Sequence, residues 1–492
     1  MYKRQRLLKE NLNIQVVYDW TASTSDYDEK MSLCIGSNTI PEIMNVNATQ
    51  YRALLKYDMI QPLDKYFDDY ASDALKSYVK SGGEELQKCI TNEDGELMAI
   101  PAPNLTAGGV NEMWIRQDWL DALGLDVPRT WDELAEVAKA FVTRDPDGNG
   151  ENDTIGILGP GNSDHMNAVG GNQFGLDPLF SCFQSYPQYW LKSEDGSVEY
   201  GSIQPETKTA LENISKLYAD GVIDPETLVR SDSKEPLLAG KVGIFFGPWW
   251  CAYTFADTTL SGSADWRAYF TPLSEDGKYY THMAEPTTQY VVASKDCKNP
   301  EAAFKIINYL VANEQKWVEE GVTSTEMGTG DFYPLYNTYD NADEIEKSYE
   351  ALTKYLAGDI SMDDVDFSTH KLLKNDMEAV TKLKKKPYDD FSLKYWNLDS
   401  DLAKTNLPRL VAIMVGDAPL VNEEYVPVYN AYNGQTETME AKWANLKKME
   451  EETFAKIIMG KADISEFDTF VENWKNQGGD QILKEINDEL SK

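Results

Sequence analysis

The chain has 492 residues and a formal net charge of −36, from 82 acidic and 46 basic side chains. This length exceeds what one hydrophobic core usually serves, so we expect two or more lobes. The excess of acidic groups argues against nucleic-acid and anionic-membrane partners, because such a surface repels phosphate groups. No apolar run in the sequence approaches the roughly 20 residues that cross a bilayer, so no transmembrane helix is expected.

The N-terminal residues Met1–Arg6 are basic, as in an export signal, but no apolar stretch follows them. We therefore expect the export signal to be missing from this sequence, and we leave roughly the first ten residues out of the fold prediction. Five cysteines and three histidines lie far apart, without zinc-ligand spacing. We expect the cysteines to be mostly small buried side chains.

The first elements alternate between strand and helix. The pattern predicts a strand at Ile14–Tyr18, a helix at Tyr27–Ile35 and a second strand at Pro41–Val46. Strands separated by helices are typical of a parallel sheet in an α/β lobe.

Helix signals recur further along the chain. Thr130 and Glu133 have the spacing of a capping box, and apolar residues then follow the period of one buried helix face. Pro300 and Glu301 open another amphipathic helix. The C-terminal third is predicted to be mainly helical.

The segment Asp145–Asp153 is the sharpest local motif. Oxygen-bearing side chains stand at loop positions 1, 3, 5 and 9, namely Asp145, Asp147, Asn149 and Asp153. Gly150 at position 6 permits a sharp turn, and Glu151 at position 7 would offer its backbone carbonyl, as in an EF-hand loop. Position 12 is Gly156 rather than a glutamate, and a strand follows. The motif predicts a structural Ca²⁺ site, and an ion-free surface turn is the alternative.

Polar and aromatic residues in loops and after strands are candidate ligand-binding residues, because strand ends in α/β lobes face ligand crevices. Flat rings stack on the apolar faces of sugars, and amides bind hydroxyl groups. The candidates are Asn45, Asn47, Asn172, Trp190, Trp249, Trp250, Tyr395 and Trp396. Trp249 and Trp250 follow an apolar run at Val242–Phe246 that predicts a strand, and Asn172 lies in a predicted polar turn at Gly170–Gln173. Packing in the core is the alternative for any single tryptophan, and we assign Trp131 and Trp474, on predicted helices, to packing.

The sequence contains no GxSxG, HExxH, P-loop or complete GxGxxG motif. We nominate no catalytic residue and predict that the chain is not an enzyme. A secreted glycoside hydrolase stays an alternative, because many such enzymes lack a short signature and need only two facing carboxylates.

Several stretches, taken in order, resemble the family 1 extracellular solute-binding proteins of bacterial ABC importers, above all the large lipoproteins of Gram-positive bacteria. These stretches are Tyr27–Met44, Gly95–Pro101, Trp114–Leu125, Phe454–Gly460, Phe467–Phe470, Trp474 and Gly478–Gly479. The Asp145–Asp153 loop is also frequent in this branch, which includes alginate-binding relatives that hold calcium in the loop.

The resemblance implies an α/β, two-lobed periplasmic-binding-protein-like fold of type II, with a mixed sheet flanked by helices in each lobe and a hinge between the lobes. We expect lobe 1 at 11–108 plus 293–335 and lobe 2 at 109–292 plus 336–492. Chain crossings are expected near 103–111, 285–292 and 328–336.

The resemblance also implies a function. The chain would capture a carbohydrate, an oligosaccharide given its size, in the cleft between the lobes and deliver it to the transmembrane subunits of an ABC permease. A peptide or another solute is the alternative ligand. The resemblance further implies an extracellular monomer with a lipid anchor on a Gram-positive cell membrane, although the anchor segment is not part of this sequence.

Overall fold

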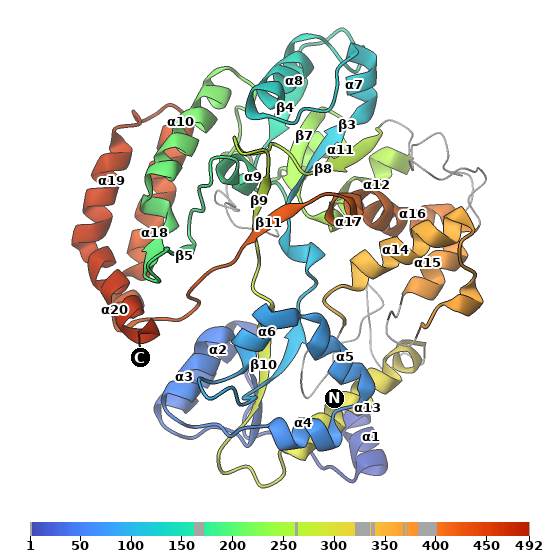
Figure 1. Cartoon of the computed structure of the whole chain (residues 1–492), viewed down its shortest axis with the longest axis vertical. Helices are drawn as coiled ribbons and strands as arrows, with labels where there is room; N and C mark the ends of the chain where they lie inside the picture. The colour runs from blue at the N-terminus through green and yellow to red at the C-terminus, as the bar shows by residue number, and fades with distance from the viewer. Residues whose placement is uncertain are drawn as a thin grey trace. The chain divides into compact units, whose positions relative to one another are not determined.

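The computed structural model (Figure 1) describes residues 2–161, 172–260, 264–319, 335, 340–367, 370, 372–381 and 401–491. The chain divides into two compact units. Unit 1 is formed by Met1–Thr106, Glu285–Glu344 and Ser368–His370, and unit 2 by Ala107–Ala284, Ile345–Phe367 and Lys371–Lys492. Residues 285–292, which we expected in lobe 2, are part of unit 1 because they lead into and form a strand of its sheet. The crossing expected near 328–336 lies outside the described residues, apart from Leu335.

The sheet of unit 1 joins segments that lie far apart in the sequence. Its order is β1 (Ile43–Val46), β10 (Thr287–Ala293) and β2 (Ile100–Pro103), and both pairs are antiparallel. Figure 1 shows β10, coloured yellow, among the blue N-terminal elements. The prediction of β1 as a strand is confirmed, but the predicted parallel sheet is wrong for this unit. The central strand comes from the second half of the chain and runs opposite to both neighbours.

Helices surround this sheet and bury one hydrophobic core against it. They are α1 (Tyr2–Leu12), α2 (Thr24–Gly36), α3 (Ala48–Lys56), α4 (Asp64–Tyr70), α5 (Asp73–Ser81), α6 (Gly83–Ile90) and α13 (Glu301–Glu319). The helices predicted at Tyr27–Ile35 and after Pro300 are confirmed as α2 and α13. The strand predicted at Ile14–Tyr18 is wrong, because no neighbouring strand pairs with it. The N-terminal residues that we left out form α1, whose Leu8 is fully buried.

Unit 2 contains a mixed four-stranded sheet. Its order is β4 (Ile155–Leu158), β7 (Val242–Gly247), β3 (Glu112–Arg116) and β8 (Trp266–Tyr269), and only the β4–β7 pair is parallel. Two smaller pairs complete the strands of this unit among the described residues. These are β5 (Trp190–Lys192) with β6 (Val198–Tyr200), and β9 (Tyr279–His282) with β11 (Tyr425–Val428). The strands predicted from the apolar runs after Asp153 and before Trp249 are confirmed as β4 and β7.

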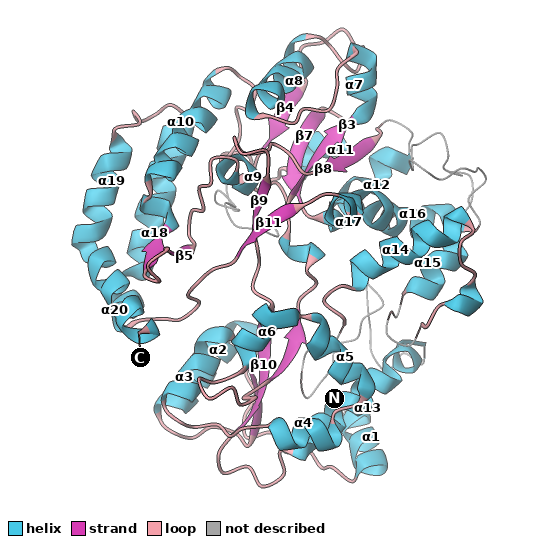
Figure 2. Cartoon of the chain, in the orientation of Figure 1, coloured by secondary structure: helices cyan, strands magenta, loops and turns pink. Residues whose placement is uncertain are grey.

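The helices of unit 2 lie on its sheet and in a large C-terminal part (Figure 2). The first half of the unit contributes α7 (Gln117–Leu123), α8 (Trp131–Thr143), α9 (Asp177–Ser181), α10 (Pro205–Ala219), α11 (Lys234–Leu238) and α12 (Ala252–Leu260). The later helices are α14 (Glu344–Ala357), which begins at the unit boundary, α15 (Leu373–Val380), α16 (Asp401–Val411), α17 (Ala418–Asn422), α18 (Glu437–Ile458), α19 (Glu466–Trp474) and α20 (Asp480–Leu490). The predicted capping box of α8 is confirmed: the Thr130 hydroxyl accepts the Glu133 N–H at 3.3 Å, and the Glu133 carboxylate accepts the Thr130 N–H at 3.1 Å.

Aromatic packing ties the C-terminal helices to the rest of unit 2. The Tyr200 ring stacks on Trp474, with centroids 4.9 Å apart, and lies 5.4 Å from Trp443. Trp474 is fully buried, as we expected of a packing residue, and Trp131 is half-buried against Phe183. Helix α18 packs against both α10 and α19. The C-terminal helices therefore share the core of the β3–β7 sheet and do not form a separate domain.

Among the described residues, no helix combines the length and apolar character needed to cross a membrane. All five cysteines are free thiols. Four are buried and Cys89 is half-buried, in agreement with our prediction of small buried side chains.

Candidate functional site

The sheet of unit 1 carries a pair of side-chain amides. Asn45 on β1 donates from Nδ2 to Oε1 of Gln289 on β10, at 2.8 Å, and both side chains are half-buried. The hydroxyl of Tyr27, on α2, donates to the backbone carbonyl of Asn45 at 2.7 Å. Gln289 stands just after the boundary between Ala284 and Glu285, so this amide pair lies where the chain enters the unit.

Tyr27 also belongs to an aromatic pair. The rings of Trp20 and Tyr27 are 5.3 Å apart and inclined by 47°, and both are half-buried. We call Trp20, Tyr27, Asn45 and Gln289 the amide–aromatic cluster. Of these four residues, the sequence-based prediction included only Asn45. Trp20 follows a segment that we took for a strand, and Gln289 is more than 200 residues further along the chain. The amide–aromatic cluster contains ring faces, which stack on sugar rings, and amides, which bind sugar hydroxyls.

Asn47, the second candidate on unit 1, has a local structural role. Its Oδ1 accepts the Gln50 N–H at 2.9 Å as the N-cap of α3, and its Nδ2 donates to the Asp28 carboxylate at 3.1 Å. These contacts engage both polar ends of the side chain. The sequence rule that amides after strands bind ligands did not separate this capping residue from Asn45, because asparagine is also a preferred N-cap.

The end of β7 in unit 2 leads directly into Trp249 and Trp250, which form a 3-10 turn, η3 (Trp249–Cys251). Trp249 is 6% exposed and its indole N–H has no hydrogen-bond partner among the described residues, whereas Trp250 is half-buried. Gly416, at the end of the π-helical turn η6 (Ala412–Gly416), packs against η3. A Cβ atom there would lie 2.7 Å from the Trp249 carbonyl oxygen, so the close approach requires glycine.

A polar segment lies beside this turn. Gln173 donates from Nε2 to the Thr254 hydroxyl at 2.8 Å. The backbone carbonyl of Asn172 accepts the side-chain amide of Asn111 at 3.0 Å. We refer to Trp249, Trp250, Asn172 and Gln173 as the β7-end surface. Gly170 and Gly171 of the predicted polar turn lie outside the described residues.

Trp190 is a core residue in this structure. It is 4% exposed, and its ring packs against Tyr200 at 4.6 Å and against Trp443 at 5.5 Å. Because neighbouring rings cover it, Trp190 stabilises the core of unit 2 and offers no face for a solute. Our placement of Trp190 at a ligand site is corrected accordingly. Tyr395 and Trp396 lie outside the described residues.

Buried carboxyl groups occupy the same unit. Burial raises the pKa of Glu112 well above its ordinary value, and the neighbouring Asp417 raises it further. Asp177 is also fully buried, and its pKa is raised by burial although Asn111 donates to it at 2.6 Å. Burial thus favours the neutral form of both carboxyl groups. They are inaccessible in this structure and are therefore not a facing pair of catalytic carboxylates.

The Asp145–Asp153 loop connects α8 to β4, as the motif predicted. The Asp145 carboxylate accepts the N–H groups of Asn149 and Gly150, at 3.1 and 3.0 Å. Asn149 donates from Nδ2 to Asp147 at 2.9 Å and to Asp153 at 3.3 Å. Gly150 has a φ of 82°, which glycine adopts without strain.

The carboxylate and amide oxygens of this loop are of the type that binds a hard cation such as Ca²⁺. Burial raises the pKa of Asp147, and a hydrogen bond with Asp145 and the charges of Asp145 and Asp153 raise it further. The charges of Asp145, Asp147 and Asp153 therefore act on one another, and the Nζ atom of Lys241 lies 2.9 Å from Asp153. Within the described part of the chain, no three His, Cys, Asp or Glu side chains stand at metal-binding spacing. The loop would therefore have to draw its carboxylates closer around an ion.

Comparison with known proteins identifies the family. The sequence profile of the bacterial extracellular solute-binding proteins matches residues 2–317. The chain belongs to this family. Its members bind solutes outside the cell, so the chain is a solute-binding protein and not an enzyme.

Two characterised relatives resemble the chain in sequence. The fructooligosaccharide ABC transporter substrate-binding protein FusA of Streptococcus pneumoniae is 30% identical over 260 residues, which cover 49% of this chain and 45% of FusA. The polygalacturonan/rhamnogalacturonan-binding protein YtcQ of Bacillus subtilis is 24% identical over 469 residues, covering 93% of this chain and 82% of YtcQ. The match to FusA thus spans less than half of that protein.

Solved structures share the fold. An HMO-binding, ABC-transporter-associated solute-binding protein from Bifidobacterium longum infantis superposes with a TM-score of 0.60 at 18% identity, covering 97% of this chain and 92% of the other. An EF-hand mutant of S. pneumoniae FusA, in complex with fructo-nystose, gives a TM-score of 0.53 at 16% identity and covers 99% and 95%. The predicted periplasmic-binding-protein-like fold is thereby confirmed.

Proposed function

We propose that this chain is the substrate-binding component of an ABC importer and that its solute is an oligosaccharide. The observation that carries the proposal is the amide–aromatic cluster of unit 1. In it the Trp20–Tyr27 ring pair is joined through the Tyr27 hydroxyl to the backbone of Asn45, whose side-chain amide pairs with Gln289. Family membership supports a binding role. The oligosaccharide and polysaccharide ligands named for FusA and YtcQ support the class of solute.

The side chains of the amide–aromatic cluster and of the β7-end surface would bind different parts of a sugar. The Trp20 ring on unit 1 and, separately, the Trp250 ring on unit 2 would each stack on the apolar face of a sugar unit and exclude water from it. The Asn45 and Gln289 amides, which each offer donors and an acceptor, would bind hydroxyl groups. Such contacts select a binding-competent conformation by differential affinity, without bond making or breaking. The loaded protein would then present the sugar to the transmembrane subunits of the permease.

Replacing either candidate stacking ring should weaken sugar binding. We expect Trp20→Ala and Trp250→Ala each to raise the dissociation constant about tenfold or more, equivalent to a loss of at least about 1.4 kcal/mol. Isothermal titration calorimetry with fructo-, galacto- and xylo-oligosaccharides would measure the change. Tyr57→Ala is the matched control, since this tyrosine is 62% exposed on unit 1 and lies outside the cluster.

Two outcomes would overturn the proposed function. One is the absence of binding to every oligosaccharide tested, together with binding to a tripeptide mixture, which would assign the chain to peptide uptake. The other is an equal effect of Tyr57→Ala and Trp20→Ala on sugar affinity. Melting temperatures of all three variants would separate lost contacts from lost structure.

We also propose that the Asp145–Asp153 loop binds a structural Ca²⁺. The side chains of Asp145, Asp147, Asn149 and Asp153 and the carbonyl of Glu151 would supply oxygen ligands, which calcium prefers. The EF-hand named in the FusA structure supports this assignment. The ion would fix the turn between α8 and β4 and so stabilise the edge of the β4–β7–β3–β8 sheet.

Removal of calcium should lower stability. With free Ca²⁺ at about 100 times the dissociation constant, binding contributes about 2.7 kcal/mol, which EDTA should abolish. Differential scanning fluorimetry would measure the fall in melting temperature, and added Ca²⁺ should restore it. Asp147→Asn should remove most of the response. Equal melting temperatures with EDTA and with excess Ca²⁺ would refute the site.

The family acts outside the cell. We propose in addition that the chain acts as a monomer held at the outer surface of a Gram-positive membrane by a lipid anchor. Release of the native protein from cells by a lipase-free high-salt wash would contradict a covalent anchor.

A further inference from the structure

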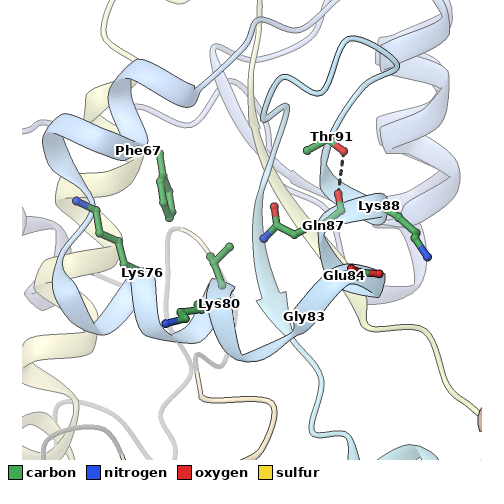
Figure 3. Close-up of a pocket in the computed structure, with 9 residues that line it drawn as sticks. Phe67, Lys76, Lys80, Gly83, Glu84, Gln87, Lys88 and Thr91 are labelled. Atoms are coloured by element: carbon green, nitrogen blue, oxygen red, sulfur yellow. Dashed lines mark hydrogen bonds between the residues drawn. The ribbon is translucent and has the colours of Figure 1, made fainter.

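A groove in unit 1 lies apart from the amide–aromatic cluster. It is formed by α4, α5 and α6 and has a volume of about 580 Å³. Figure 3 shows Phe67 of α4 on one side and Gln87 of α6 on the other, with the amide of Gln87 directed into the gap. This volume is within the range of small-molecule sites, whereas protein partners usually need broad surfaces of about 800 Å² on each side.

The two sides of the groove differ in chemistry. The Phe67 ring is half-buried and supported from behind by Phe304, whose centroid is 6.3 Å away, and Val79 extends the apolar wall. The opposite wall is polar: the Thr91 hydroxyl donates to the backbone carbonyl of Gln87 at 2.9 Å, and the exposed side-chain amide of Gln87 lines the groove. An apolar ring facing an amide suits a sugar unit, which has an apolar face and a hydroxylated edge.

The charged side chains of the groove place a second requirement on its ligand. The groove is lined by three lysines, Lys76, Lys80 and Lys88, and by one acid, Glu84, on a chain whose net charge is −36. Lys88 is paired with Glu85 at 2.6 Å, and the ammonium group of Lys76 donates to a backbone carbonyl at 3.1 Å, which does not neutralise it. Lys80 is exposed and makes no ion pair with any residue that the structure describes.

These charges select an anion. Salt screens the acidic surface beyond about 8 Å, and in the lining itself three lysines outnumber the single acid, Glu84. We propose that the groove binds a carboxylate-bearing sugar unit, with the ring against Phe67, the hydroxyls at Gln87 and the carboxylate at Lys80. The choice of a saccharide rests on the proposed function, whereas the requirement for a carboxylate comes from the groove itself.

The test uses the full chain with trigalacturonate, and with maltotriose as the neutral trisaccharide. A Trp20→Ala/Trp250→Ala background removes the candidate stacking ring of each unit. In that background trigalacturonate should still bind and maltotriose should bind far more weakly. Lys80→Gln should weaken trigalacturonate binding about three- to fivefold, as expected for one exposed ion pair. Glu84→Gln should strengthen it about twofold.

Lys65→Gln on α4 is the matched control, because it makes the same charge change outside the groove. Equal effects of Lys65→Gln and Lys80→Gln, or no trigalacturonate binding in the double-variant background, would overturn the proposal. If the unaltered protein binds no neutral oligosaccharide but shows Lys80-dependent trigalacturonate binding, the proposed function fails for neutral sugars and the groove assignment stands.

Discussion

Glu450→Gln should make unit 2 more stable above neutral pH and leave it nearly unchanged at pH 4. Glu450 lies on α18, is fully buried and accepts the Tyr200 hydroxyl at 2.8 Å. Burial raises its pKa from 4.5 to about 7, although hydrogen bonds from Tyr200 and Ser202 act in the opposite direction. The folded protein therefore keeps a proton that the unfolded chain releases between these two values.

The pH dependence of the free energy of unfolding follows from this difference between the folded and unfolded pKa values of Glu450. A raised pKa in the folded state contributes stability at low pH, and this stability is lost as pH rises from 4.5 to about 7. At about 1.4 kcal/mol per pH unit, the loss totals about 3 kcal/mol. Glutamine cannot ionise, so the difference in free energy of unfolding between variant and unaltered protein should grow by about 3 kcal/mol between pH 4 and pH 8.

Urea unfolding followed by tryptophan fluorescence would measure this, since most of the tryptophans belong to unit 2. Tyr200→Phe is an informative control. Without the hydroxyl donor the ionised carboxylate is less favoured, so the pH-dependent loss should extend above pH 7. Parallel pH profiles for the Glu450→Gln variant and the unaltered protein would contradict the raised pKa.

His282→Phe should have the opposite pH signature, protecting unit 2 in acid. His282 ends β9, is fully buried, and neither ring nitrogen has a hydrogen-bond partner among the described residues. Its ring stands edge-on to Tyr186 and Tyr189, at centroid distances of 5.1 and 4.8 Å. Burial lowers its pKa from 6.5 to about 3.

A base whose pKa is lowered on folding stays neutral in the folded state while the unfolded chain takes up a proton. Its contribution is present above pH 6.5 and is lost as pH falls towards 3, at about 1.4 kcal/mol per unit. His282→Phe preserves an aromatic ring and removes this dependence. Between pH 7.5 and pH 5 the variant should therefore gain about 2 kcal/mol relative to the unaltered protein.

Tyr189→Phe separates packing from titration. It removes the hydroxyl that donates to the Met283 carbonyl at 2.7 Å and leaves His282 unchanged. Its effect on the free energy of unfolding should be the same at pH 5 and at pH 7.5. If His282→Phe also shows no pH dependence, the pKa of His282 is not lowered on folding and the prediction fails.

Local signals predicted local structure well. The capping box of Thr130 and Glu133 marked the start of α8, and the apolar run before Trp249 marked β7. Pairing between distant segments was not visible in the same way. Nothing near Ile43–Val46 indicates that its partner strand is β10, because pairing partners are not written into local periodicity.

The candidate site was predictable only in part. Asn45 and Asn47 have the same residue type and both follow apolar residues, yet one pairs with Gln289 and the other caps α3. Trp190 is distinguished from Trp250 only by the tertiary packing of Tyr200 and Trp443 around it. Sequence patterns indicated candidate residue types, whereas contacts across the sheet and core determine the surroundings of each copy.

The position of β10 bears on how the protein is made. Residues 1–106 contain only β1 and β2, which do not pair with each other, and the strand that joins them is at Thr287–Ala293. A nascent chain emerging in order would complete all three strands of this sheet only after most of unit 2 had been synthesised. Until then, β1 and β2 would keep unpaired strand edges, which favour aggregation. Pairing strands so far apart in the sequence also gives the sheet a high contact order and slow folding. Chaperone dependence should therefore be greatest for chains stalled between β2 and β10.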